Sequence, residues 1–176
     1  TALIEAHADD DAPAAEFAPI PPAKAPRPDA EIDVAALRAD WAAMKDTHEF
    51  FGMLRTHDVA REQAMRLIGS EWARPVPLDA ARHVFERASA TAQPIMVFAF
   101  NRGCVQIHTG PVETIKVMGP WLNVLDPRFN LHLREDRIAS AWIVRKPGDT
   151  GDVTSLELFD RDGWRALLAE LEGEPA

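Results

Sequence analysis

Ile95-Met-Val-Phe-Ala-Phe-Asn-Arg-Gly-Cys-Val-Gln-Ile-His-Thr109 is the stretch that decides the fold class, because the hydrophobic period changes here. Residues 95–100 form a short apolar run of the kind found in strands. Asn101-Arg-Gly103 has the composition of a tight turn, and Cys104–Thr109 follows as a second strand. The stretch therefore predicts an antiparallel hairpin.

Further strand candidates, joined by short turns, follow this hairpin. They are Val112–Val117, Trp121–Leu125, Phe129–Arg134, Ile138–Arg145 and Val153–Phe159. Short connections between successive strands favour antiparallel neighbours, so the second half of the chain is expected to form one large meandering sheet.

Helical patterns precede the hairpin. Asp33 is placed to cap a helix whose apolar residues from Val34 to Met44 recur at spacings of three and four. Further helix starts are expected at Asp46, with Glu49 completing a capping box, at Asp58 and at Asp79. A last helix over Trp164–Leu171 is expected to close the chain. Helices followed by a run of hairpins predict an α+β fold.

The first 33 residues differ in composition from the rest. They hold six of the fourteen prolines, and eight acidic residues face only two basic ones. Such a segment buries too little apolar surface to fold alone, so residues 1–33 are interpreted as an acidic, extended linker. Residues 34–176 are interpreted as one domain.

Composition excludes several classes of function. The net charge of −9 argues against a nucleic-acid or anionic-membrane surface as the main partner. No apolar run reaches the length of a membrane helix, so membrane insertion is not expected. The one cysteine, Cys104, excludes an internal disulfide and suits a reducing compartment. Phosphate-loop, dinucleotide-binding and zinc-protease motifs are absent.

His48 is the histidine with the most distinctive surroundings, because Phe50 and Phe51 follow it at an expected helix start. An imidazole at an apolar rim suits a flat, apolar ligand that carries a metal. The alternative, a histidine whose hydrogen bonds are satisfied near a helix start, stays open. His108 and His132 fall on polar alternates of their strands, where a paired-histidine metal site or two half-exposed histidines are both compatible with the pattern.

Five separated motifs resemble the bacterial hemin-degrading and haem-transport family typified by HemS. They are Lys45-Asp-Thr-His-Glu-Phe-Phe51, Pro94–Gly110, Gly119-Pro-Trp-Leu-Asn-Val-Leu125, Phe129-Asn-Leu-His-Leu-Arg-Glu135 and Ala141-Trp-Ile-Val-Arg-Lys-Pro147. Members carry two similar halves in tandem, and this chain resembles the C-terminal half with its preceding linker. Since it starts at Thr1 without a methionine, we expect an upstream segment.

The resemblance implies haem b as the cofactor and assigns roles to particular residues. The histidine of the family's Asp-x-His-x-Phe-Phe motif, here His48, is the axial ligand of the haem iron. Arg61 and Lys146 correspond to cations near the haem and its propionates. Phe98 and Phe100, on the first strand of the hairpin, are implied as apolar contacts.

The sequence departs from the family pattern near its end. Members continue with a further strand that ends in a Phe/Tyr-Gly-x-Arg motif, whose tyrosine and arginine help to hold haem. Here Gly163 runs directly into Trp164, and the sequence has no tyrosine. We therefore expect the family's final helix at this point. Either the protein has lost that strand or its residues are missing between Gly163 and Trp164, and the second alternative is favoured.

Three functions remain open at this stage. The chain is a haem-degrading, oxygenase-like enzyme, or a cytoplasmic haem chaperone, or a structural half-domain that does not bind haem by itself. The resemblance implies haem as ligand, a haem importer ATPase or a haem oxygenase as protein partners, and an N-terminal tandem half or a homodimer.

Overall fold

The computed structural model describes residues 5–6, 25–101, 103–163 and 165–171. The helices are η1 (Asp29–Glu31), α2 (Val34–Ala42), α3 (Glu49–Thr56), α4 (Arg61–Ile68), α5 (Ala80–Thr91) and η2 (Glu135–Arg137). The strands are β1 (Ala73–Pro75), β2 (Ile95–Phe100), β3 (Val105–Gly110), β4 (Ile115–Met118), β5 (Trp121–Asp126), β6 (Phe129–Arg134), β7 (Ser140–Lys146), β8 (Val153–Phe159) and β9 (Arg165–Leu171). The predicted α+β order of helices before hairpins is confirmed.

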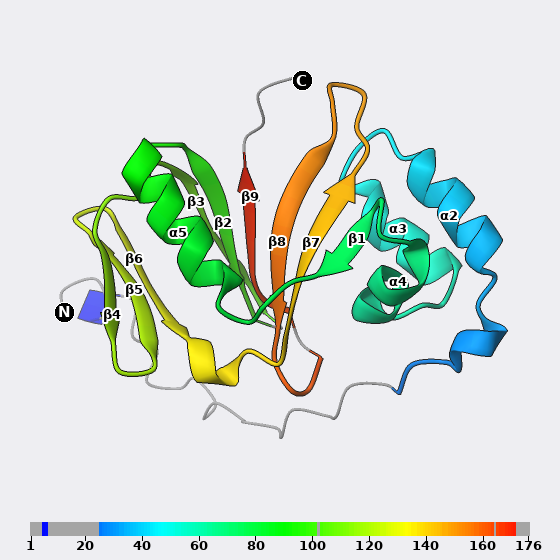
Figure 1. Ribbon diagram of the computed structural model, residues 1–176, viewed down its shortest axis with the longest axis horizontal. Coiled ribbons are helices and arrows are strands. Elements are labelled where there is room, and N and C mark those ends of the chain that lie inside the picture. The colour runs from blue at the N-terminus through cyan, green and yellow to red at the C-terminus, as the bar shows by residue number, and fades with distance from the viewer. Residues whose placement is uncertain (1–4, 7–24, 102, 164, 172–176) are drawn as a thin grey trace.

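The strands form two antiparallel sheets where one meander was expected. One sheet has six strands in the order β1-β7-β8-β9-β2-β3, and the other has three in the order β4-β5-β6. Meander connections hold within β4–β6 and within β7–β9, but β9 returns to pair with β2, which lies far earlier in the chain. In Figure 1 the small sheet and α5 lie at one side of the molecule, and helices α2–α4 lie at the other.

The predicted closing helix is wrong. Residues 165–171 form strand β9, which pairs on one side with β2 and on the other with β8. The residues of this segment are good helix formers. A helix would leave the facing edges of two strands without hydrogen-bond partners, however, and that cost outweighs the local preference. A strand thus follows directly after the turn in which the Gly163 N–H donates to the Asp160 carbonyl, but residues 165–171 do not carry the Phe/Tyr-Gly-x-Arg motif.

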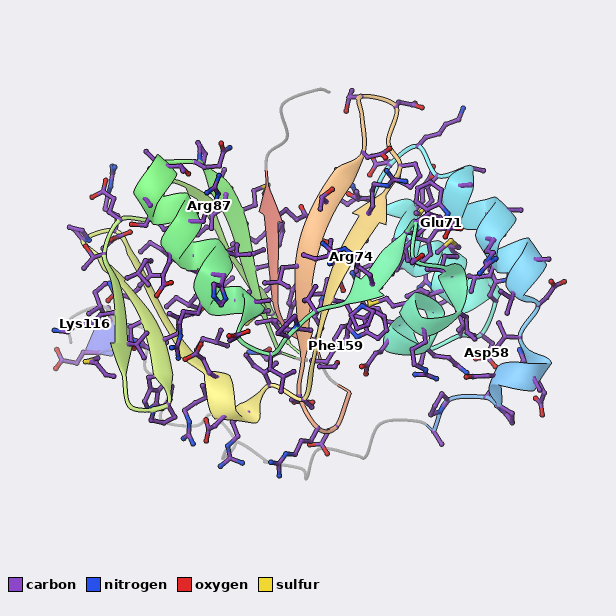
Figure 2. The ribbon with its side chains drawn as sticks, in the orientation of Figure 1. Asp58, Glu71, Arg74, Arg87, Lys116 and Phe159 are labelled. Carbon is purple, nitrogen blue, oxygen red and sulfur yellow. The ribbon has the colours of Figure 1, made fainter. Side chains whose placement is uncertain are left out.

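Each face of the six-stranded sheet is covered by a different layer. On one face, side chains of β2, β8 and β9 pack with α5 and the small sheet around buried residues such as Phe85, Leu122 and Leu158. On the other face, Trp142, Val144 and Phe159 pack against α2, α3 and α4. Phe159 is labelled in Figure 2, near the middle of the molecule.

The helices α2–α4 cover only the β1–β7–β8 part of their face. Because side chains alternate along a strand, Phe98 and Phe100 of β2 lie on this same face, opposite the buried Ile95 and Val97. Their register partners on β3 are Ile107 and Val105, and both of these apolar side chains are exposed. We call the surface formed by Phe98, Phe100, Val105 and Ile107 the open half-face.

Helix termini confirm the cap predicted at Asp33 and correct the starts predicted at Asp46 and Asp58. The helix expected from Asp58 begins at Arg61, with Ala60 as its N-cap. The Asp33 carboxylate accepts a hydrogen bond from the Ala36 backbone and caps α2, and Gly69, at φ +107°, ends α4. The helix expected from Asp46 begins at Glu49 instead, with His48 as its N-cap. Asp46 does not cap it, because its carboxylate bonds to His48.

Most of the expected acidic linker lies outside the described residues, and its boundary at residue 33 stays a prediction. Its described end, residues 25–33, contacts α4: the Gln63 side chain donates to the Arg27 carbonyl and to the Asp29 carboxylate. None of the helices in the described ranges is long and apolar enough to cross a membrane.

Candidate functional site

A buried carboxylate lies where α4 meets the sheet. Glu157, on β8, has no exposed surface, and its two oxygens accept hydrogen bonds from Nε and Nη2 of Arg61 at 2.6 and 2.7 Å. Lys146, on the neighbouring strand β7, donates from Nζ to the same carboxylate at 2.9 Å and to the Ser155 hydroxyl at 3.3 Å. One carboxylate therefore joins a helix and two strands.

Charge controls the ionisation of this group. Burial by itself would raise the pKa of Glu157, but the charges of Lys146 and Arg61 and their hydrogen bonds outweigh it and lower the pKa to about 2. Burial lowers the pKa of Lys146, and the positive charge of Arg61 acts in the same direction, whereas Glu157 opposes both. Glu157 thus stays an anion that holds two cations.

A third cation, Arg165 at the start of β9, lies beside this pair. Its guanidinium carbon stands 3.6 Å from the centroid of the Phe100 ring and 5.6 Å from that of Phe51. Burial lowers the pKa of Arg165 to about 10, and the positive charge of Arg61 adds to the effect. Arg165 therefore spans the space between α3 and the open half-face.

Glu170, also on β9, supplies a second carboxyl on this face. Its register partners are Met96 of β2 and Ser155 of β8. Burial raises its pKa; the charge of Lys146 opposes that shift, and the charge of Glu157 adds to it. Glu170 is thus less ready than an ordinary glutamate to neutralise the cations around it.

The cluster leaves positive charge available for a ligand. Three cationic side chains, Arg61, Lys146 and Arg165, face two carboxyls, Glu157 and Glu170. In the described part of the chain, Nη1 of Arg61 is the one buried side-chain nitrogen or oxygen without a hydrogen-bond partner. A buried guanidinium N–H without a partner is costly, so this atom suits an incoming anion.

Aromatic rings line the side of the cluster that faces the open half-face. The Arg61 guanidinium lies 4.5 Å from the Phe50 centroid and 5.3 Å from that of Phe51. Phe50 is buried, whereas Phe51 is 56% exposed. Phe98 and Phe100 stack at 6.2 Å with an angle of 8° between their rings. An apolar, flat surface thus borders a positively charged one.

His48 lies at the N-terminal end of α3, one helical turn before Phe51. Its side chain is 93% exposed, and its Nδ1 lies 2.6 Å from Oδ1 of Asp46. Within the described residues Nε2 has no hydrogen-bond partner, so this nitrogen is available to a ligand. None of the described contacts joins His48 to the charged cluster. Phe50 and Phe51, which follow His48 in the sequence, do contact that cluster through Arg61.

The structure brings four of the five predicted residues together, whereas the described contacts of His48 are with Asp46 alone. Arg61 and Lys146 share Glu157, and Phe98 and Phe100 form the neighbouring aromatic surface. Glu157, Glu170 and Arg165 were missed. Strand alternation gave no signal for Glu157, because its position between Leu156 and Leu158 is the polar alternate of the predicted strand. The helix expected over 164–171 hid the other two.

The two strand histidines, His108 and His132, have other partners. His108 stacks on Phe129 of the small sheet, with ring centroids 3.9 Å apart, and His132 bonds to the Asn123 side chain. The two lie in different sheets, so the shared face considered for a paired-histidine site does not form. Among the described residues no group of three or more His, Cys, Asp or Glu side chains is placed to hold a metal ion.

Comparison with known proteins gives consistent matches. A family model described as the haemin-degrading HemS.ChuX domain matches residues 58–168. The hemin transport protein HmuS of Yersinia pestis is 41% identical over 162 residues, which are 92% of this chain and 46% of that protein. The chain spans about half the length of the curated relatives it matches.

Solved structures agree with the sequence matches. The structure of holo-PhuS, a heme-binding protein from Pseudomonas aeruginosa, superposes with a TM-score of 0.89 at 47% identity and covers 99% of this chain and 51% of that one. The heme degrading enzyme ChuS of Escherichia coli O157:H7 gives a TM-score of 0.78 at 44% identity, over 81% of this chain and 44% of that one.

Proposed function

Because this chain belongs to the haemin-degrading HemS.ChuX domain family, as its motifs indicated, we propose that it binds haem on the open half-face and passes it on. The observation that carries the proposal is the juxtaposition of a partly exposed aromatic surface with a partly buried cluster of net positive charge. Haem combines the matching features in one molecule: a flat apolar ring, two carboxylates and an iron that takes nitrogen ligands.

The charged cluster is the proposed site of the propionates. Arg61 offers Nη1, which has no protein partner, and Arg165 lies against Phe100 at the border of the aromatic surface. A charge-assisted bond from a guanidinium to a carboxylate is stronger than one between neutral groups. Lys146 is buried against Glu157, so we propose that it contributes its charge from behind and holds Arg61 in place through the shared carboxylate.

The aromatic residues are the proposed contacts of the porphyrin. Phe98 and Phe100 lie parallel and belong to a strand whose neighbour, β3, exposes Val105 and Ile107 on the same face. Covering this surface removes apolar area from water, which favours binding at about 25 cal/mol for each Å².

His48 is the proposed axial ligand. A neutral imidazole binds haem iron through one ring nitrogen, and the other nitrogen takes a second hydrogen bond. Nε2 of His48 is exposed, and Nδ1 is held by Asp46. Bound haem would supply its own redox chemistry, and this chain's residues would orient it and neutralise its propionates.

Openness of the site favours delivery over degradation as the function of this chain. Phe51 and Ile107 are each 56% exposed, so in the described ranges the aromatic surface stays accessible to water. Oxidative opening of a porphyrin calls for a site that excludes water and side reactions. We propose a cytoplasmic carrier that takes haem from an importer ATPase and gives it to an acceptor such as a haem oxygenase. An N-terminal tandem half or a second copy is proposed to complete the walls.

Titration of hemin into the purified chain tests the proposal. We expect saturable binding with a Soret band typical of histidine ligation, and a loss of that band and of affinity in His48→Ala. His83→Ala is the matched control, because His83 is an exposed histidine on α5, which packs on the opposite face of the sheet. Wild-type spectra in His48→Ala would refute the ligand, and absence of binding by the wild-type chain would favour the structural half-domain.

A further inference from the structure

The segment that carries His48 is anchored to the core, although most of its side chains are exposed. Residues 43–48 connect α2 to α3, and Met44 in this connection and Phe50 in the first turn of α3 are both buried. The backbone N–H of Asp149, in the β7–β8 connection, donates to the Lys45 carbonyl at 2.9 Å. The position of the histidine backbone is therefore set by the core.

One carboxylate oxygen then sets the orientation of the ring. Oδ1 of Asp46 accepts from the backbone N–H of His48 at 2.7 Å and lies 2.6 Å from its Nδ1. Aspartate is ordinarily ionised at neutral pH, and Oδ1 of Asp46 already acts as an acceptor toward the His48 backbone. An ionised carboxylate only accepts hydrogen bonds, so Nδ1 holds the proton and Nε2 points its lone pair to solvent.

We propose that Asp46 is the positioning residue of His48, which it holds in the tautomer and ring orientation that present Nε2 to the haem iron. The inference rests on the proposed function, in which His48 is the axial ligand. Hydrogen bonding of a carboxylate to the distant nitrogen of a ligating imidazole fixes the ring and increases its basicity. Asp46 therefore makes His48 a stronger donor to ferric iron and stabilises that oxidation state.

A second aspartate–histidine pair in the chain shows why the choice of nitrogen matters. Asp40 lies 2.7 Å from Nε2 of His57, and the His57 side chain is only 10% exposed. In that pair the Asp40 carboxylate bonds to Nε2 of His57, and the ring is largely buried. Nε2 of His57 is therefore not available to a metal. The two pairs have the same chemistry and nearly the same distance, and only Asp46–His48 leaves Nε2 exposed.

The experiment compares Asp46→Asn, Asp46→Glu and the control Asp40→Asn with the wild-type 176-residue chain, using hemin as the probe. For Asp46→Asn we expect hemin affinity to fall about tenfold, the lower end of the range for such partners. At saturating hemin we also expect a higher reduction potential and a lower iron–histidine stretching frequency in the ferrous protein. Asp46→Glu should recover part of each shift, and Asp40→Asn should match the wild type.

The readouts separate a positioning role from a structural one. An Asp46→Asn variant with weaker hemin binding but wild-type potential and stretching frequency at saturation would overturn the inference. His48→Ala separates this failure from that of the proposed function. If His48→Ala keeps the wild-type spectrum, the ligand assignment itself fails and the inference falls with it; if it loses the spectrum while Asp46→Asn keeps every property, only the positioning role is lost.

Discussion

Oε2 of Glu157 lies 2.6 Å from Nε of Arg61, across 96 positions of sequence, and the carboxylate has no exposed surface. The pair joins α4 to the centre of the six-stranded sheet, and Lys146 completes it from β7. It therefore fixes the distance between the helical unit and the open half-face on which the proposed ligand lies. Its removal affects both stability and binding.

Replacement of Glu157 is expected to destabilise the protein strongly. Glu157→Gln leaves Arg61 and Lys146 buried without an anion, and loss of one partner of a buried pair costs about 3–5 kcal/mol. Chemical denaturation followed by circular dichroism measures the change. Glu71→Gln is the control: Glu71 is an exposed residue near β1 (Figure 2), and its replacement should change stability by less than about 0.5 kcal/mol. Equal effects in the two variants would contradict a structural role of the pair.

Stability is expected to fall in acid because of the same carboxylate. Its pKa is lowered from 4.5 in the unfolded chain to about 2 in the folded one, so its contribution is complete above about pH 5. As the pH falls through 4.5 toward 2, the unfolded state takes up the proton first and about 3 kcal/mol is lost. Denaturation series between pH 2 and 6 measure this slope, and it should be shallower in Glu157→Gln. A Glu157→Gln slope as steep as that of the wild type would assign the acid sensitivity to other groups.

Arg165 is expected to matter for the ligand more than for the fold. Arg165→Gln removes a cation that lies 3.6 Å from the Phe100 ring, and hemin affinity should fall about tenfold, as for the loss of one charge-assisted hydrogen bond. Arg161→Gln is the control. It changes the net charge by the same amount, but Arg161 lies in the exposed turn before β9 and not against the rings, so this variant should bind hemin as the wild type does. Equal losses in both variants would point to a long-range charge effect.

Turnover separates delivery from degradation. With ascorbate as electron donor and catalase present, we expect the Soret band of the haem-loaded chain to persist, because the aromatic surface is open to water in the described residues. Excess apomyoglobin should then remove the haem. Conversion to a bile pigment while catalase removes hydrogen peroxide would show that this chain degrades haem, and the carrier proposal would be withdrawn.

Local pattern predicted much of the fold. The apolar spacing of α2, the hairpin β2–β3 and the strands β5, β6 and β8 were placed within one residue or two, because each is defined by contacts close in sequence. Asp33 marked the start of α2 correctly for the same reason. The family motifs located the four residues that the structure brings to one face, and the family itself is confirmed.

Features that depend on distant pairing were not predicted. Arg165–Leu171 has the composition of a helix, and only the unpaired edges of β2 and β8 make it a strand. Arg165 and Glu170 were hidden by that error. The six-stranded sheet forms because β9 pairs with β2, while β4–β6 remain a separate sheet. No turn between strands that are consecutive in the sequence specifies the β9–β2 pairing.

The sequence by itself determined the α+β order, the Asp33 cap of α2, the motif that contains His48 and the family, because these rest on neighbouring residues and on short patterns. Only the tertiary structure decided that Glu157 is buried and that Lys146 and Arg61 are its partners. Burying a carboxylate is unfavourable until cations from other elements reach it, and those elements meet only in the folded chain. The charge that the proposed ligand would meet is therefore a property of the fold.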